Sequence, residues 1–276
     1  MTNTTIEWTD ATWNPVTGCT EVSPGCDHSY ARRVAERFGG SKAFPRGFDV
    51  TLREDRLQQP RRWRKPRRIF VNSMSDLFHK DVPDAFIDRI FDTMNSAAQH
   101  TYQILTKRPE QMRRVVHDYY AYTEASSVGF LRAVPLPNAW LGVSIESNAF
   151  AWRADMLRET PAAVRFLSLE PLLGPVDAVD FTGIDWVIVS GESGPGARPM
   201  ARAWVREVRD RCAAARIPFF FKQWGEWTPD FGYARRECYL NGDFYGLVGK
   251  KRAGRELDDL EWSQFPGGAA LAEAGG

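Results

Sequence analysis

Several features that would restrict the function of this chain are scarce or missing in its sequence. The N-terminal stretch MTNTTIEWTDATW has no basic segment followed by an apolar run, so it does not resemble a secretory signal. No apolar segment approaches the ~20 residues that a membrane-spanning helix needs. The four histidines show no H-E-x-x-H or comparable zinc-hydrolase spacing. We therefore expect a cytoplasmic protein with no membrane partner.

The net charge and the number of cysteines are also low. The net charge of +1 over 276 residues gives no global attraction to nucleic acid, so any such attraction must come from a local patch. Four cysteines are too few for a disulfide scaffold, and in a reducing compartment a close cysteine pair indicates metal binding or redox chemistry. Cys212 and Cys238 lie far along the chain, and we interpret them as isolated thiols.

The clearest regularity is a series of short apolar runs, each of which ends in polar or charged residues. These runs cover residues 68–76, 101–109, 139–147, 164–172, 185–194 and 218–225, with a weaker candidate at 11–19. Continuous apolar runs are typical of strands that are covered on both faces, as in a parallel sheet. Amphipathic stretches with helical spacing lie between them at 83–99, 109–120 and 202–215. The alternation predicts repeated βαβ units.

A barrel or an open doubly wound sheet could be built from such units. Because nearly every predicted strand ends in residues capable of chemistry, we favour an α/β fold with a full or partial (β/α) TIM-type barrel, whose strand ends meet at one mouth. An open sheet would concentrate these residues at one switch point. We expect a single domain over residues 1–265 with a short β-rich or irregular segment after Trp227, and a disordered tail at 266–276.

The strand ends supply the candidate site residues. The candidate catalytic residues are Lys107, Glu146, Glu170, Glu192 and Lys222. The candidate cofactor-binding residues are Asn72, Ser75, Asp76, Ser193, Arg198 and Gln223. Two cations and three carboxylates on five strand ends favour a polar small-molecule or nucleotide site. The alternative is that these charges pair with one another and orient the loops.

Two further stretches have both a functional and a plain interpretation. In SGESGPGARPM (190–200), the glycine-rich backbone could bind a phosphate, with Arg198 supplying charge, or it could be an ordinary turn. The stretch RRWRKPRR (61–68) is either a solvated lead into the next strand or a nucleic-acid contact. In the second case the contact residues are Arg61, Arg62, Trp63, Arg64 and Lys65.

An early loop holds the closest pair of cysteines. Cys19 and Cys26 flank Ser23-Pro24-Gly25, a turn sequence that can fold the chain back and bring both thiols toward one point. A thiolate cluster needs such a loop, because several sulfurs must reach one metal centre. Two cysteines alone are a weak signal.

The loop belongs to a longer resemblance. NPVTGCTEVSPGCDHSYARRVAERF resembles the opening motif of a phage-associated family of uncertain function, N-P-x-x-G-C-x-x-V-S-P-G-C-x-x-C-Y-A. The likeness continues through VNSMSDLFHKDVP, QILTKRPEQM, WLGVSIESNAFAWR, RFLSLEPLLGP, DWVIVSGESGPGARPM and PFFFKQWGEW, and so covers most of the chain. The third cysteine of that family falls on Ser29.

More distantly, C-x6-C-x2-C is similar to the C-x3-C-x2-C loop of radical SAM enzymes, with the spore photoproduct lyase-like branch as the nearest comparison. This resemblance implies a 4Fe–4S cluster at Cys19, Cys26 and position 29, and S-adenosylmethionine held partly by a polar strand-end segment such as Asn72–Asp76 or Gly191–Gly194. A serine hydroxyl is a poor cluster ligand beside a thiolate, so the cluster is expected to be damaged or lost in this chain.

Two hypotheses follow. The first is an iron–sulfur barrel enzyme of the radical SAM kind, for which phage association and the basic stretch suggest DNA or a nucleotide as the target. The second is a non-catalytic barrel that binds nucleic acid or a protein partner and uses metal only for structure.

Overall fold

The computed structural model describes residues 4, 6–125 and 135–267, which form two compact units. Unit 1 comprises the described residues within 1–144 and 155–165, and unit 2 those within 145–154 and 166–276. Most of the predicted tail at 266–276 lies outside the described residues. The single domain over 1–265 stays a prediction.

Unit 1 contains four parallel strands in the order β1-β4-β5-β6. Their bounds are β1 (Ala11–Trp13), β4 (Arg68–Val71), β5 (Thr101–Thr106) and β6 (Ala139–Ser144). A short antiparallel pair, β2 (Val16–Thr17) and β3 (Thr51–Leu52), follows β1 and precedes β4 in the chain. The helices that begin in this unit are α1 (Tyr30–Arg37), α2 (Asp84–Ser96) and α3 (Pro109–Ala125), with 3-10 turns η1 (Pro24–Cys26), η2 (Glu54–Arg56) and η3 (Pro60–Arg62).

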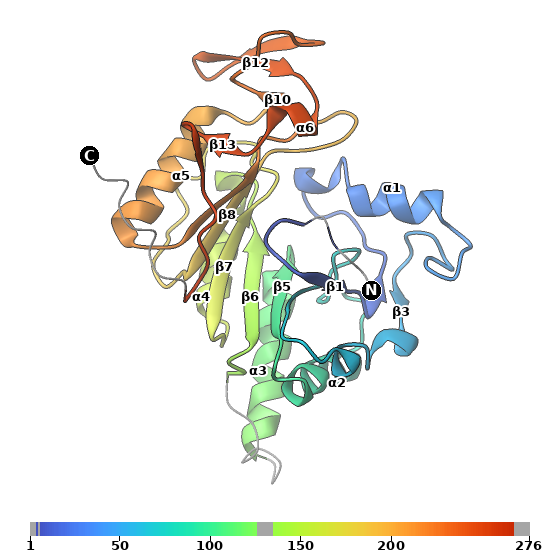
Figure 1. The fold of residues 1–276 in the computed structure, drawn as a ribbon. Helices are drawn as coiled ribbons and strands as arrows, with labels where there is room; N and C mark the ends of the chain where they lie inside the picture. Colours follow the sequence, from blue (N-terminus) through green and yellow to red (C-terminus); the bar gives the residue numbers. More distant parts are fainter. Residues whose placement is uncertain (1–3, 5, 126–134, 268–276) are drawn as a thin grey trace. The chain divides into compact units, whose positions relative to one another are not determined.

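The apolar runs of the sequence form the centre of this sheet. Val71 is the register partner of both Trp13 and Ile104, and all three side chains are fully buried. On α2, Ile87, Ile90 and other apolar residues at helical spacing are buried, and α3 lies beside α2 (Figure 1). The strands are therefore positioned by burial, and their carboxyl ends all lie at one edge of the sheet.

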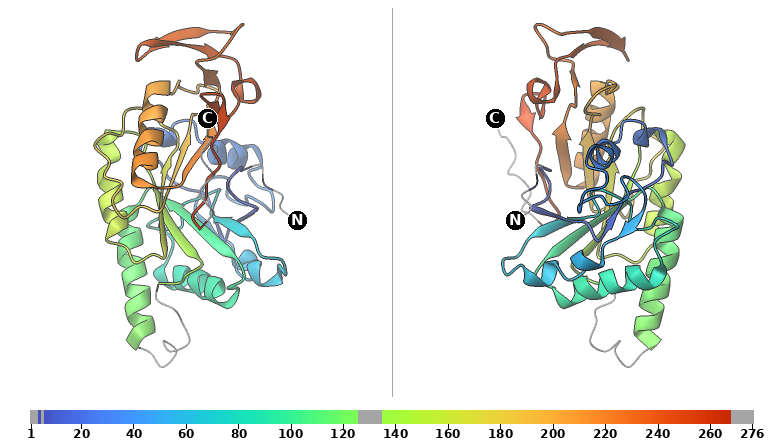
Figure 2. Two further views of the ribbon diagram at one scale, coloured as in Figure 1. Left: turned by 60° about the vertical axis from the view of Figure 1, so that its left-hand side comes forward. Right: turned by 90° about the vertical axis from the view of Figure 1, so that its right-hand side faces the viewer.

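Unit 2 contains parallel strands in the order β7-β8-β9 and the helix α5 (Arg202–Ala215). The strand bounds are β7 (Val164–Leu169), β8 (Trp186–Ser190) and β9 (Phe219–Gln223). Both β7 and α4 (Trp152–Arg158) run across the boundary between the units, while the turn η5 (Asn148–Phe150) lies wholly in unit 2. Figure 2 shows α5 along the strands of this unit, and its buried residues include Val205, Val208 and Cys212.

The end of the chain adds small antiparallel elements to unit 2. A three-stranded sheet has the order β10-β12-β11, formed by β10 (Trp227–Thr228), β11 (Glu237–Leu240) and β12 (Asp243–Leu247). The helix α6 (Lys250–Ala253) follows, and then the pair β13 (Glu256–Leu257) and β14 (Leu260–Glu261). The sequence predicts a β-rich or irregular closing segment after Trp227, and the structure shows the β-rich form.

The fold class is mixed α/β with seven parallel strands, four in unit 1 and three in unit 2. Within the described residues these strands do not close into a ring, so a full barrel is not present there. Each predicted helix at 83–99, 109–120 and 202–215 is observed. Among the described helices, none combines the length and the apolar character that crossing a bilayer requires.

Candidate functional site

The first cysteine of the loop is held by the backbone around Gly18. Gly18 has φ of +87°, and a Cβ atom there would lie 2.2 Å from the Asp49 carbonyl oxygen. The Gly18 amide donates to the Met74 carbonyl at 3.0 Å, and the Cys19 amide donates to the Phe48 carbonyl at 3.1 Å. Only glycine combines this φ with so close an approach. Cys19 is therefore fixed by main-chain contacts on both sides.

The second part of the loop is a 3-10 turn that leads into a helix. η1 ends at Cys26, whose amide donates to the Ser23 carbonyl at 2.9 Å. Ser29 is the N-cap of α1, and its Oγ accepts a hydrogen bond from the Arg32 amide at 3.2 Å. Serine is among the preferred N-cap residues. The hydroxyl at the third predicted ligand position thus already has a structural role.

All three predicted ligand positions line one cavity of about 180 Å³ in unit 1. Much of its remaining wall comes from the carboxyl ends of β4, β5 and β6. The polar side chains there belong to Asn72, Ser73, Ser75, Asp76, Thr106, Lys107, Arg108 and Ser144. Of the residues predicted from the sequence, the structure thus brings together the loop positions, Lys107 and three of the cofactor-binding candidates.

Asp76 organises one side of this cavity. Its Oδ1 accepts hydrogen bonds from the Thr106 hydroxyl at 2.7 Å and from the Phe78 amide at 3.0 Å. Its Oδ2 accepts from the Lys107 amide at 3.1 Å and from Arg108 Nη1 at 2.9 Å. A nearly buried carboxylate with four donors is a fixed part of the structure. Asp76 therefore positions Arg108 and is not itself available to a ligand in this arrangement.

Arg108 connects that carboxylate to the cysteine loop. Its Nη1 donates to the Cys19 sulfur at 3.4 Å, and its Nη2 donates to the Thr20 carbonyl and hydroxyl at 2.9 and 3.1 Å. Behind Thr20 lies the buried His79, whose Nδ1 accepts from the Asp81 amide at 3.2 Å. Nε2 therefore carries the proton and donates to the Thr20 hydroxyl at 2.8 Å. Burial lowers the pKa of His79, and the positive charge of Arg108 lowers it further.

The ionisation of Cys19 reflects its surroundings. Burial raises the pKa of the Cys19 thiol and the Asp76 charge adds to that rise, whereas Arg108 acts in the opposite direction through its charge and its hydrogen bond. The net pKa lies above that of an ordinary thiol. Cys19 is therefore protonated at neutral pH, and a metal ion would have to displace that proton to bind.

Asn72 is a residue of the cavity wall with a left-handed backbone conformation. It directly follows β4 with φ of +60°, a conformation that non-glycine residues adopt uncommonly. Its Oδ1 accepts from the Val16 amide at 3.2 Å, so its amide nitrogen is the free end of the side chain. That nitrogen is buried and has no hydrogen-bond partner among the described residues. A buried donor without a hydrogen-bond partner, on a residue that lines a cavity, is a group that a ligand could satisfy.

The predicted residues of unit 2 are arranged differently, in ion pairs. The pairs are Glu146 with Arg153, Glu170 with Lys222, and Glu192 with Arg198. The first is the most buried, with side chains exposed by only 1% and 2%. The pair between β7 and β9 ends joins two of the candidate catalytic residues to each other. This matches the alternative in which strand-end charges fix the loops.

The 190–198 loop is also internally satisfied. The Gly194 amide donates to Glu226 Oε1 at 2.9 Å, and the Arg198 amide donates to Glu192 Oε2 at 2.8 Å. Ser193 is half-buried in the same loop. Because carboxylates already occupy these amides, the arrangement leaves little capacity to bind a phosphate.

Gln223 ends β9 at a close backbone contact. Its carbonyl accepts from the Gly191 amide at 3.0 Å, and a Cβ atom on Gly191 would lie 1.8 Å from the Trp224 carbonyl oxygen. The Gln223 Oε1 is buried and has no donor among the described residues. It is the one predicted cofactor-binding residue of unit 2 with such an unsatisfied side-chain atom in the described part of the chain.

The basic stretch lies at the opposite end of β4 from the cavity, since it precedes Arg68 and the cavity residues follow Val71. Arg61 donates to the Ser96 hydroxyl at 2.7 Å, and the Trp63 ring packs edge-on against His100. The exposed basic residues are Arg61, Arg62, Arg64 and Lys65. If the patch binds nucleic acid, it does so apart from the cysteine loop.

Three residues that shape the cavity region are not among the candidate site residues predicted from the sequence: Arg108, Thr20 and His79. The sequence shows Arg108 at a strand end, but the orientation of its guanidinium depends on the carboxylate of Asp76, 32 residues earlier. Thr20 follows the first cysteine directly, and its hydroxyl has no distinguishing pattern in the sequence.

Solved structures of spore photoproduct lyase are similar to this chain at low identity. A cysteine-to-serine mutant of that enzyme matches with 12% identity and a TM-score of 0.44, over 89% of this chain and 70% of its own. A double mutant with bound AdoMet and dinucleoside spore photoproduct matches with 11% identity and a TM-score of 0.45, over 88% and 69%. A likeness at this level says nothing of what this chain binds.

None of the curated proteins compared matches the chain. A family whose description reads "Protein of unknown function (DUF5131)" matches residues 3–266, which is nearly the whole sequence. The chain therefore belongs to the DUF5131 family.

Proposed function

We propose that this protein is a nucleotide- or nucleic-acid-binding member of its family, built on a radical-SAM-like iron–sulfur scaffold that lacks its third thiolate at Ser29. The supporting observation is the shared cavity: Cys19, Cys26 and Ser29 line it together with polar strand ends. Perturbed and unsatisfied polar groups that meet at a cavity favour a binding site over a structural turn.

The donor set decides what the cavity can hold. A cluster of the three-cysteine kind needs three thiolates, and this chain offers two thiols and a hydroxyl that already caps α1. Among the described residues there is no group of three or more His, Cys, Asp or Glu side chains that could hold a metal ion. The residues present do not fit a 4Fe–4S cluster, and no radical step is assigned to this chain.

What remains in the cavity favours binding of a polar small molecule. The Asn72 amide nitrogen offers a buried donor without a partner in the described structure, and Lys107 contributes a cation at the wall. The floor beneath them is rigid because Asp76 accepts four hydrogen bonds. S-adenosylmethionine and simple nucleotides are the first ligands to examine, because the sequence resemblance implies them.

The proposal can be tested by restoring the missing ligand. We expect Ser29→Cys, reconstituted anaerobically with iron and sulfide, to retain both in the proportion of a 4Fe–4S cluster and to absorb visible light. The unsubstituted protein should retain little. Ser29→Ala is the matched control, because it removes the helix cap without adding a thiol.

A second comparison separates the cluster from adventitious iron. Adding Cys19→Ser to Ser29→Cys should abolish retention, since a thiolate is lost again. Failure of Ser29→Cys to bind iron while it remains folded would contradict the scaffold proposal. If the cluster forms but its spectrum does not respond to S-adenosylmethionine, the radical-SAM-like part of the proposal is contradicted. The proposal of a metal site would then still hold.

Binding by the unsubstituted chain needs its own measurement. We expect calorimetric titration with S-adenosylmethionine or a nucleotide to show binding that Asn72→Ala weakens by about tenfold, as expected for loss of one buried hydrogen bond. Equal affinity in the variant, or no binding of any of these ligands, would contradict the proposed site.

A further inference from the structure

The small sheet at the end of unit 2 displays an unusual number of exposed aromatic rings. Tyr233, Tyr239 and Phe244 are exposed by 75%, 66% and 59%. Tyr239 and Phe244 are direct partners across β11 and β12, with ring centroids 5.1 Å apart. Single exposed apolar residues are ordinary, but a concentrated group marks an interaction surface.

The register of β11 and β12 places the rings of Tyr239 and Phe244 on one outward face. Phe244 and Gly246 lie two residues apart on β12 and so project to the same side. A Cβ atom on Gly246 would lie 2.5 Å from the Phe231 ring, so that ring occupies the space above the glycine and extends the aromatic row. The opposite face is anchored, because Tyr245 is fully buried and its hydroxyl accepts from the Arg202 amide at 2.7 Å.

Two basic segments adjoin this aromatic row. Arg235 and Arg236 follow Tyr233 in the chain, and α6 carries Lys250, Lys251 and Arg252; all five are exposed. Arg252 donates to the Tyr233 carbonyl at 3.3 Å, which joins α6 to the segment that carries the exposed ring. A Cβ atom on Gly249 would lie 3.0 Å from Arg235 Nη2, so the side chain of Arg235 also reaches the start of α6.

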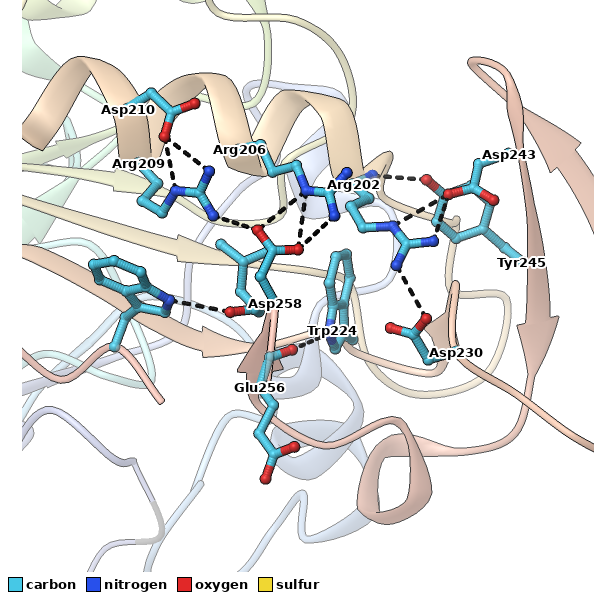
Figure 3. A network of polar contacts seen from close by, with 12 residues as sticks. Arg202, Arg206, Arg209, Asp210, Trp224, Asp230, Asp243, Tyr245, Glu256 and Asp258 are labelled. Carbon is cyan, nitrogen blue, oxygen red and sulfur yellow. Dashed lines mark hydrogen bonds and ion pairs between the residues drawn. The ribbon is translucent and has the colours of Figure 1, made fainter. Parts of the chain in front are cut away.

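Most neighbouring carboxylates are already engaged. Figure 3 shows Asp230 and Asp243 bound to Arg202, at 3.0 and 2.7 Å. Glu226 accepts from the Gly194 amide, and Glu237 is the exposed carboxylate that remains beside the aromatic row. The surface formed by Phe231, Tyr233, Arg235, Arg236, Tyr239, Phe244 and Lys250–Arg252, here called the aromatic–basic surface, therefore carries a local positive charge in a nearly neutral chain.

We propose that the aromatic–basic surface binds single-stranded nucleic acid. Exposed rings can stack on bases while nearby Arg and Lys side chains contact the phosphates. A duplex offers its phosphates but not its base faces, so it uses only part of this surface. The inference concerns unit 2 alone and does not depend on a cofactor in the cavity of unit 1.

The test is the anisotropy of a fluorescent oligothymidylate titrated with the full chain, against a duplex of equal length. We expect tighter binding of the single strand. Tyr239→Ser with Phe244→Ser should weaken it by about tenfold or more, since base stacking on an aromatic ring contributes strongly to such complexes. Tyr122→Ser is the matched control, because Tyr122 is 75% exposed on α3 in unit 1.

Charge is tested through the salt dependence. Lys250→Gln with Lys251→Gln should reduce the slope of log affinity against log salt by about 1.4, if both lysines contact phosphates. Arg62→Gln with Arg64→Gln alters the other basic stretch and should leave the slope unchanged. Loss of binding in that variant alone would overturn the proposal and assign the interaction to residues 61–65.

If the serine variants lose their fold, the lysine variants and the comparison of single strand with duplex still test the proposal, and a ring-preserving pair serves as the control. Tyr239→Phe with Phe244→Tyr preserves both rings, and we expect it to bind like the unsubstituted chain. Equal affinity for duplex and single strand, unchanged affinity in a folded serine variant, or no binding of either nucleic acid would each overturn the inference.

Discussion

The strand ends of unit 1 and those of unit 2 start from the same kind of sequence and end in different states. After β4 and β5, polar side chains line a cavity with the two thiols, and Asn72 retains a buried donor without a partner in the described structure. In unit 2, the carboxylates Glu146, Glu170 and Glu192 are each paired with a cation. Polar residues at strand ends are therefore not sufficient evidence of a site. What distinguishes them is whether their hydrogen-bonding capacity is already used.

The paired charges of unit 2 and the cavity residues of unit 1 should also respond differently to substitution. The ion pairs of unit 2 hold neighbouring segments in place, and removal of one partner would leave a buried charge. In unit 1, by contrast, the ion pair of Asp76 and Arg108 lies beside the half-exposed thiol of Cys19. The comparison predicts that substitutions at the three ion pairs of unit 2 mainly affect stability, whereas those around the cavity mainly affect the cysteine loop.

The largest effect is expected at the buried ion pair of unit 2. Arg153→Met should lower the free energy of unfolding by about 3–5 kcal/mol, because the Glu146 carboxylate would stay buried without the positive charge of Arg153. Urea unfolding followed by tryptophan fluorescence measures this. The double variant Glu146→Gln with Arg153→Met should recover much of the loss. A single-variant loss below about 1 kcal/mol would mean that the pair behaves like an exposed one.

The next largest effect is expected where the cysteine loop begins. Gly18→Ala should cost more than about 2 kcal/mol, because it adds a backbone clash to an unfavourable positive φ. Gly40→Ala provides the control: Gly40 has φ of +80°, and a Cβ atom there would meet nothing within 4 Å. Both variants are compared by urea unfolding. Equal losses would show that the contact with Asp49 relaxes freely.

A smaller effect is expected on the thiol itself. Arg108→Leu should raise the pKa of Cys19 further, because the guanidinium that favours the thiolate is removed. The measurement is the pH midpoint of iodoacetamide alkylation at Cys19, read by peptide mass spectrometry with Cys26 as the internal reference. The pH midpoint is needed because the alkylation rate at a single pH also depends on how accessible the thiol is to the reagent. A lowered midpoint would contradict the described role of Arg108.

The smallest effect concerns His79. Burial lowers the pKa of its imidazole in the folded state, so below about pH 6.5 the unfolded chain binds more protons and stability falls with decreasing pH. His79→Gln should therefore reduce the loss of Tm between pH 7.5 and 5.5, by about 2 °C or less. His117→Gln, at an exposed position on α3, is the control. An unchanged pH dependence in His79→Gln would contradict this account.

Much of the fold was accessible from the sequence. The runs at 68–76, 101–109 and 218–225 were recognisable as strands because buried parallel strands need continuous apolar residues on both faces. The helix at 83–99 was visible from its apolar stripe, and the loop of Cys19 and Cys26 from its turn residues. The closing sheet after Trp227 could be described only as β-rich, because its strands are short and half-exposed.

The candidate site was less accessible, because its character depends on partners that are distant in the chain. Asp76 accepts hydrogen bonds from residues 30 or more positions away in the sequence, and Glu170 pairs with the still more distant Lys222. No local pattern separates a satisfied carboxylate from an available one. The same holds for Asn72, whose side-chain oxygen is engaged by the distant Val16 amide while its amide nitrogen has no partner among the described residues.

By itself, the sequence determined the strands of the parallel sheet and the helices α2, α3 and α5, the positions of the two thiols, and the serine where a related motif has cysteine. Only the tertiary structure decided which polar groups are neutralised and which remain free to bind. The physical reason is that burial depends on local apolar pattern, whereas the pairing of charges and donors depends on which distant segments the fold brings into contact.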